Sequence, residues 1–270
     1  MFAGGGVTAL SAGERRVCLL AGAAGTLGTD FCRRFADRYD IAAIYRNSRP
    51  SVACHDQTAV DPLRPEAELP ENRCPVFAVQ ADLTTEAGCE RAVDLTLARF
   101  GQIDLLVNAA AAPVWGPMLG NDRLLGTAEY QLTTNVLAPL RLAVVAARRF
   151  WQNRDGENRR HNRNVVNLSS VAGLRLYAGS GQSLYAASKA ALNHLTAHMA
   201  IEFAPVGIRV NAVAPNSFPS LVPTERATDA VVALDEGAST ATIVIVDGES
   251  DEVIELHPFT AQARPAQLRA

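Results

Sequence analysis

Short apolar runs alternate with longer segments of helical periodicity along most of this chain. Seven runs are expected to be strands: Arg15–Gly22, Asp40–Arg46, Pro75–Leu83, Ile103–Ala109, Arg163–Ser170, Gly207–Pro215 and Ala241–Gly248. Helices are expected between them, at Thr26–Tyr39, Thr85–Phe100, Thr127–Trp151, Ser183–Phe203 and Thr224–Leu234. Apolar strands separated by helices predict an α/β fold whose sheet is parallel and covered on both faces. We expect a doubly wound seven-stranded parallel sheet with helices on both faces.

Two stretches interrupt this alternation. Arg49–Cys74 contains four prolines, so a regular helix is not expected there. Gln152–Asn164 is polar and arginine-rich, and we interpret it as a solvated loop. We expect one domain over residues 1–270: a flexible N-terminus at 1–14, a core at 15–248 and a C-terminal tail at 249–270.

Composition excludes several classes of function. The net charge of −3 gives no field that would attract nucleic acid or an anionic membrane. No segment approaches the roughly 20 apolar residues that a membrane span needs. The five cysteines are widely spaced without a histidine cluster, so neither a metal site nor a disulfide framework is expected. These features favour a cytoplasmic protein with no nucleic-acid or membrane partner.

A glycine-rich turn follows the first expected strand. In "AGAAGTLG" the glycines occupy positions 22, 25 and 28, immediately before the first helix. Glycines at this place allow a tight turn and let the backbone approach a pyrophosphate at the helix N-terminus. The sequence therefore predicts a Rossmann fold that binds a dinucleotide.

The end of the second expected strand indicates which dinucleotide. Sites for NAD place a carboxylate there, on the ribose hydroxyls. This chain has Tyr45, Arg46, Asn47 and Ser48 instead. A guanidinium suits a 2′-phosphate, so NADP(H) is preferred. Asp82, at the end of the third strand, is expected to accept a hydrogen bond from the adenine amino group.

Tyr185 and Lys189 form the strongest catalytic pattern. They are four residues apart in an expected helix and share one face. Lys189 is the only lysine beside 24 arginines, and coincidence explains the spacing poorly because the chain has five tyrosines in 270 residues. A nearby ammonium is expected to lower the pKa of the Tyr185 phenol and make it a general acid or base.

With these motifs the sequence resembles the short-chain dehydrogenase/reductase family over about residues 15–215. The family's Tyr-x-x-x-Lys signature matches Tyr185 and Lys189, its serine matches Ser170 rather than Ser169, and its active-site asparagine matches Asn135. The resemblance implies these cofactor-binding residues: Gly22, Gly25, Thr26, Leu27, Gly28, Tyr45, Arg46, Asn47, Ser48, Asp82, Leu83, Asn108, Ala109, Ala110, Tyr185, Lys189, Pro215, Asn216 and Ser217.

The resemblance also implies a mechanism. Tyr185 would give a proton to a carbonyl oxygen as hydride arrives from the nicotinamide, and Ser170 would hydrogen-bond that oxygen. Lys189 would hold the ribose hydroxyls, and Asn135 would anchor a water that resupplies protons. The alternatives are reduction of an imine or enone, and a non-catalytic NADP(H) sensor or scaffold of the same fold.

The chain departs from the family pattern between Asn216 and Val246. This interval has room for one helix, so the segment that usually covers the substrate is expected to be shortened at 216–240. The cleft would then be open to a bulky or carrier-bound substrate, or closed by the tail or a partner subunit. The expected substrate is an apolar or bulky carbonyl or alcohol compound. Trp115, Leu174, Tyr177 and Phe218 are the expected substrate contacts. By resemblance, the helices at 127–151 and 183–203 would pair subunits in a homodimer or homotetramer.

Overall fold

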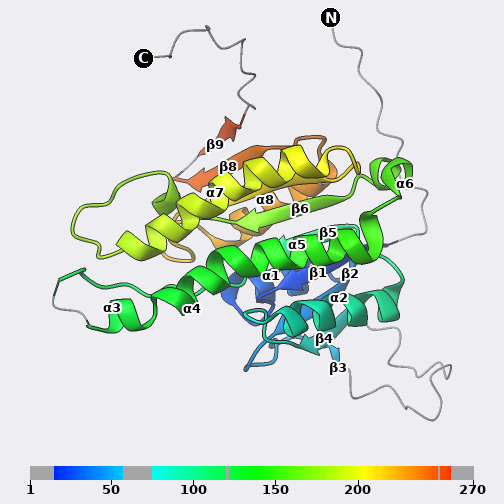
Figure 1. Ribbon diagram of the computed structural model, residues 1–270, viewed down its shortest axis with the longest axis horizontal. Coiled ribbons are helices and arrows are strands. Elements are labelled where there is room, and N and C mark those ends of the chain that lie inside the picture. The colour runs from blue at the N-terminus through cyan, green and yellow to red at the C-terminus, as the bar shows by residue number, and fades with distance from the viewer. Residues whose placement is uncertain (1–14, 57–74, 120–121, 249, 257–270) are drawn as a thin grey trace, which may run out of the picture.

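The computed structural model describes residues 15–56, 75–119, 122–248 and 250–256. These residues form a nine-stranded sheet in the order β3-β4-β2-β1-β5-β6-β7-β8-β9 (Figure 1). The strands are β1 (Arg16–Ala21), β2 (Tyr39–Tyr45), β3 (His55–Asp56), β4 (Val76–Gln80), β5 (Leu105–Asn108), β6 (Asn164–Leu168), β7 (Arg209–Pro215), β8 (Thr242–Asp247) and β9 (Ser250–Glu255). All seven expected strands are present.

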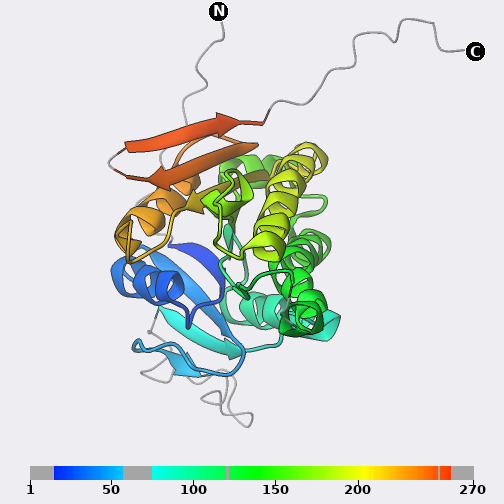
Figure 2. The same cartoon turned by 90° about the vertical axis from the view of Figure 1, so that its left-hand side faces the viewer.

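Helices cover both faces of the sheet, as Figure 2 shows. They are α1 (Thr26–Phe35), α2 (Glu86–Phe100), α3 (Asp122–Gly126), α4 (Ala128–Leu132), η3 (Thr133–Leu137), α5 (Ala138–Ala146), η4 (Ala147–Trp151), α6 (Asp155–Arg160), η5 (Val171–Gly173), α7 (Ser183–Phe203) and α8 (Thr224–Glu236). The expected helix at 127–151 is divided into four segments, of which η3 and η4 are single π-helical turns.

Alternate residues of the central strands enter two cores. Leu19 belongs to the core shared with α2, α5 and α7, whereas Leu20 belongs to the core shared with α1 and α8. This follows from the two-residue period of a strand, whose successive side chains point to opposite faces. The expected doubly wound architecture is therefore confirmed.

The sheet has two strands more than expected. β3 pairs with β4 in parallel, and β9 pairs with β8 in antiparallel register, with Ile254 opposite Ile243. Residues 250–255, expected to be tail, therefore extend the sheet, because Ile254 packs against the small core formed by β7, β8 and η5. The expected flexible N-terminus, most of the proline-rich stretch and residues 257–270 lie outside the described residues.

The interpretation of Gln152–Asn164 as a solvated loop was only partly right, because residues 152–156, 159 and 160 are exposed but the segment is not a plain loop. The segment contains α6, and Asn158 and Arg163 within or beside it are fully buried. The Asn158 amide donates to Trp151 O at 2.8 Å and to Val206 O at 2.7 Å. Arg163 pairs with Asp104 at 3.1 Å. These partners satisfy the polar groups that made the segment look solvated.

Candidate active site

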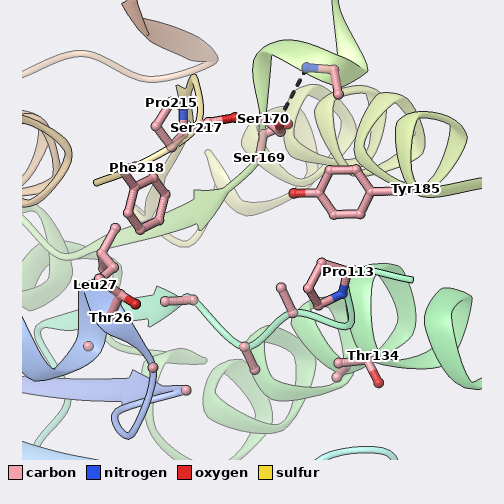
Figure 3. Close-up of a pocket in the computed structure, with 18 of the residues that line it drawn as sticks. Thr26, Leu27, Pro113, Thr134, Ser169, Ser170, Tyr185, Pro215, Ser217 and Phe218 are labelled. Carbon is pink, nitrogen blue, oxygen red and sulfur yellow. Dashed lines mark hydrogen bonds between the residues drawn. The ribbon is translucent and has the colours of Figure 1, made fainter. Parts of the chain in front are cut away.

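A cavity of about 890 Å³ lies where the loops after β1, β2, β4, β5, β6 and β7 meet (Figure 3). These loops follow the carboxyl ends of parallel strands, which is where doubly wound sheets bind ligands. The Tyr185 hydroxyl points into the cavity from α7, and Thr26 and Leu27 lie at the far end. The cavity therefore connects the glycine turn with the expected catalytic tyrosine.

The glycine turn leaves bare backbone at one end of the cavity. Gly22 has a φ of +83°, and a Cβ there would lie 2.6 Å from Ala110 N. A Cβ on Gly28 would lie 2.4 Å from the Gly22 carbonyl oxygen. Helix α1 begins at Thr26, so its first amide groups lie beside this turn. A cradle without side chains at a helix N-terminus fits the pyrophosphate of a dinucleotide.

Residues after β2 and β4 border the part of the cavity where the sequence predicts the adenosine group. Tyr45, Arg46, Asp82 and Leu83 line the cavity there. A neighbouring cavity of about 710 Å³ shares Arg46 and Asp82 and is also lined by Asn47 and, from α2, by Arg91. Hydrogen bonds from Thr84 and the nearby Arg46 lower the pKa of Asp82. Two guanidinium groups thus border one concave site.

Arg91 was missed by sequence reasoning. Its side chain donates from Nε to the Gln80 carbonyl oxygen at 3.2 Å, which places it against the end of β4. The signal available in the sequence was its position about one helical turn after Gly88. In the structure, Gly88 lies so close to Asp82 that a Cβ would be 1.9 Å from the Asp82 carbonyl oxygen.

Three expected cofactor residues line neither cavity: Ser48, Asn108 and Lys189. Ser48 is exposed beyond the end of β2. Asn108 is buried, and its amide donates to Asn167 Oδ1 at 2.8 Å, so its side chain joins β5 to β6. The neighbouring Ala109 and Ala110 do line the cavity, as expected. The prediction is corrected accordingly: at the end of β5, alanines rather than Asn108 border the cavity.

Tyr185 is the polar group most directly placed for chemistry. Its ring contacts the edge of Trp115, with ring centroids 6.1 Å apart. Burial raises the pKa of Tyr185, and a hydrogen bond with Ser170 opposes this effect. The expected lowering of the Tyr185 pKa by Lys189 is therefore not found, and in this structure burial is the larger effect.

Lys189 is buried below Tyr185 on the same face of α7. Its Nζ donates to the Leu168 carbonyl oxygen at 2.6 Å and lies 5.8 Å from the centroid of the Tyr185 ring. Burial lowers the pKa of Lys189 to about 8. An ammonium has three donors, so the bond to Leu168 fixes the group at the end of β6 without exhausting its donors.

Ser170 and Ser169 have different partners. The Ser170 hydroxyl accepts a hydrogen bond from Ala172 N at 3.2 Å, drawn as a dashed line in Figure 3, and it neighbours Tyr185. The Ser169 hydroxyl donates to the Lys189 carbonyl oxygen at 3.4 Å. The geometry thus favours Ser170 as the partner of the reacting oxygen.

Asn135 lies in the π-helical turn η3 and is fully buried. Its Oδ1 accepts from Ala112 N at 2.8 Å, and its Nδ2 donates to Ser188 Oγ at 3.0 Å. It therefore joins the loop after β5 to α7, one residue before Lys189. Gln131, one turn earlier, donates to the Ala112 and Val114 carbonyl oxygens at 2.8 and 3.1 Å.

Three of the four expected substrate contacts line the cavity. Trp115, Tyr177 and Phe218 do so, together with Leu221, which the sequence analysis did not select. Leu174 does not, because it packs against the small core of β7, β8 and η5. Whether an apolar loop residue faces a cavity or a core depends on the path of the loop, which periodicity does not encode.

The β8–β9 hairpin supports the loops after β6 and β7 that border the cavity. Asn216, which lines the cavity with Pro215 and Ser217, donates to Asp247 Oδ1 at 2.8 Å. Arg175, in the loop after β6, bonds to Asp247 and donates to Glu252 at 2.9 Å. The bond from Asn216 and the pairing with Arg175 lower the pKa of Asp247. One carboxylate therefore connects both loops.

Helix α8 takes no part in covering the cavity. It begins at Thr224, and its buried residues Ala227 and Val231 belong to the core shared with α1. From the segment between β7 and α8, only residues 216, 217, 218, 220 and 221 border the cavity.

Comparisons with known proteins agree with this geometry. The profile of the short chain dehydrogenase family matches residues 16–229, and the chain belongs to this family. It is 29% identical over 221 residues to glucose and ribitol dehydrogenase homolog 2 of Arabidopsis thaliana, covering 80% of this chain and 70% of that protein. It is 30% identical over 204 residues to the (2S)-[(R)-hydroxy(phenyl)methyl]succinyl-CoA dehydrogenase subunit BbsD of Thauera aromatica, covering 75% and 73%.

Solved structures show the same fold. A short chain dehydrogenase from Mycobacterium smegmatis superposes with a TM-score of 0.69 and 26% identity, covering 88% of this chain and 93% of that one. The family comprises oxidoreductases that use a nicotinamide cofactor.

In the described ranges, no three His, Cys, Asp or Glu side chains are grouped so that they could hold a metal ion. No helix there has the length and apolar character required to cross a bilayer.

Proposed function

We propose that the protein is an NADP(H)-dependent oxidoreductase that reduces a ketone or aldehyde carbonyl, or oxidises the corresponding alcohol. The observation that carries the proposal is the placement of the Tyr185 hydroxyl. This hydroxyl points into a largely apolar cavity, beside Ser170 and near the buried Lys189. The same cavity extends to the glycine turn.

Each residue of this set has a chemical role. Tyr185 holds the proton that passes to the carbonyl oxygen, and Ser170 donates a hydrogen bond that orients this oxygen. With the cofactor bound, Lys189 would donate one of its remaining hydrogens to the nicotinamide ribose. The bound cofactor supplies the hydride. Asn135 fixes the loop after β5 and Ser188, and by resemblance holds a water that returns a proton through Lys189.

The cofactor is proposed to be NADP(H) because cations border the adenosine end. Arg46 follows β2 where sites for NAD carry a carboxylate, and Arg91 faces the same concave site. A guanidinium forms charge-assisted hydrogen bonds with a phosphate monoester. Asp82 remains the candidate partner of the adenine amino group.

Replacing Arg46 by Ala is expected to raise the Kd of NADPH about tenfold or more and to leave the Kd of NADH within twofold. The lost interaction is one charge-assisted hydrogen-bond group, which contributes roughly 1.5–3 kcal/mol. Arg91→Ala should act in the same direction with a smaller effect. The measurement is fluorescence titration of both cofactors, with Arg160→Ala, an exposed change at the end of α6, as the control. An equal loss for NADPH and NADH would refute the assignment of a 2′-phosphate site.

The activity itself is tested by following the absorbance of NADPH with a panel of ketones, aldehydes, imines and enones. Consumption with ketones or aldehydes supports the proposal, whereas turnover confined to imines or enones would assign the alternative reaction. Tight NADPH binding without turnover of any compound would instead indicate a sensor or scaffold.

Assembly and location are also proposals. Helices α4 to η4 and α7 are proposed to pair subunits in a homodimer or homotetramer. Four exposed apolar side chains on these helices support this: Tyr130, Leu132, Leu137 and Ile201. A cytoplasmic location is supported by Cys18, Cys32, Cys54 and Cys89, which are unpaired in the described part of the chain.

A further inference from the structure

The mouth of the cavity carries an unusual concentration of exposed apolar side chains. Of the twelve large hydrophobic residues exposed in the described ranges, half lie on the three loops after β5, β6 and β7. We call these six the apolar rim: Trp115, Met118, Leu119, Leu176, Tyr177 and Leu221. Single exposed apolar residues are ordinary, but a gathered set at the edge of a pocket marks a binding surface.

The apolar rim is continuous with the reacting group. Trp115 contacts the Tyr185 ring, and Trp115, Tyr177 and Leu221 line the cavity itself. The loops after β5 and β6 are joined by a backbone hydrogen bond from Gly116 N to the Gly181 carbonyl oxygen, at 2.8 Å. In Figure 1 both loops extend on the same side of the molecule. A compound bound at Tyr185 can therefore extend out of the cavity along an apolar surface.

Leu119 and Leu176 belong to the apolar rim but do not line the cavity itself. Their exposed fractions are 89% and 99%, so neither contributes to the packing of the described structure. An apolar ligand that covers such residues fits their gathering on loops beside a cavity.

The charge of the three loops narrows the chemistry of that ligand. Residues 112–126, 174–182 and 216–223 contain two cations, Arg123 and Arg175. Arg175 is paired with Asp247 and Glu252. A substrate carried by coenzyme A or another phosphate-bearing group would need cations for its phosphates at the mouth. Besides Arg123, on α3, the loops offer no cation that carboxylates have not already paired.

We infer that the natural substrate is an uncharged carbonyl compound whose apolar body extends from Tyr185 past Trp115 onto Leu119 and Leu176. This inference rests on the proposed function and adds the substrate class. This substrate class differs from the CoA thioesters and the small polar carbonyl compounds that other reductases use. The cavity holds the reacting end, and the apolar rim selects for the length of the apolar remainder.

The test compares kcat/KM for unbranched methyl ketones from butanone to undecanone, in the parent and in the double variant Leu119→Ser, Leu176→Ser. In the parent, kcat/KM should rise with chain length. In the double variant, the ratio of kcat/KM for undecanone to that for butanone should fall about tenfold, because two partly covered leucines are lost from the longer complex. Calorimetric titration of undecanone into the protein should show the same loss in affinity.

Two controls make the result specific. Val253→Ser removes another exposed apolar side chain, on β9 and outside the cavity lining, and should leave the ratio unchanged. Ethyl acetoacetate and acetoacetyl-CoA present the same ketone, the first without phosphates and the second with them. The value of kcat/KM for the CoA ester should not exceed that for the ethyl ester. A tenfold preference for the CoA ester would overturn the inference.

Failure of the inference can be distinguished from failure of the proposed function. If the parent reduces butanone and undecanone with the same kcat/KM, or the double variant keeps the parent's ratio, the apolar rim does not bind substrate although the activity stands. If NADPH is consumed with none of the ketones or aldehydes, the proposed function itself is wrong.

Discussion

Tyr185→Phe is expected to reduce kcat for carbonyl reduction by about a thousandfold while leaving NADPH bound. General acid catalysis contributes typically 10²–10⁴-fold, and phenylalanine keeps the ring that packs against Trp115. The change therefore removes one hydroxyl and little else. The measurement is kcat with the best ketone of the panel, together with the Kd of NADPH by fluorescence.

The raised pKa of Tyr185 also gives a direction to this chemistry. A buried phenol whose pKa is raised keeps its proton through the neutral range, which is the form that reduction requires. Oxidation of an alcohol needs the phenolate and should therefore speed up as pH rises. A Tyr185→Phe variant that keeps kcat within tenfold of the parent, with the same thermal unfolding midpoint, would show that another group supplies the proton.

Much of the fold could be predicted because its strands are apolar on both faces and bounded by glycine or polar residues. β9 could not, since "SDEVIE" has only two apolar residues and is stabilised by pairing along β8 and by Arg226, which bonds to Asp251. α6 was missed for a related reason. Its polar residues are satisfied by partners distant in sequence, such as Val206 for Asn158.

The predicted site shows the same division. The pairing of Tyr185 with Lys189 depends only on helical spacing, and α7 runs from Ser183 to Phe203 as expected. The roles of Leu174 and Asn108 depend on how loops and neighbouring strands pack, so both were misplaced. The effect of Lys189 on the pKa of Tyr185 depends on how deeply both groups are buried. The four-residue spacing brings the two groups together, but burial is the main cause of the shift in both pKa values.

Replacing Lys189 by Met is expected to lower kcat by about a hundredfold or more, the lower end of what a positioned proton-transfer group contributes. The methionine side chain keeps the length of the stem and removes the ammonium that contacts the Leu168 carbonyl oxygen. That carbonyl then lacks its buried donor, which should also lower the thermal unfolding midpoint. If stabilising osmolytes restore the thermal unfolding midpoint of Lys189→Met but not its kcat, the chemical role is separated from the structural one.

The pH profile of the parent and of Lys189→Arg tests the charge itself. Because burial lowers the pKa of Lys189 to about 8, the ammonium predominates below that pH and the neutral amine above it. Reduction in the parent should therefore decline as pH rises through about 8. Arginine stays charged throughout this range, although its planar fork fits poorly where a compact ammonium donates to one carbonyl. Lys189→Arg should have a lower kcat and a profile without the decline near pH 8. If the decline persists in Lys189→Arg, it belongs to another group, and the ammonium of Lys189 does not set the pH range of the reaction.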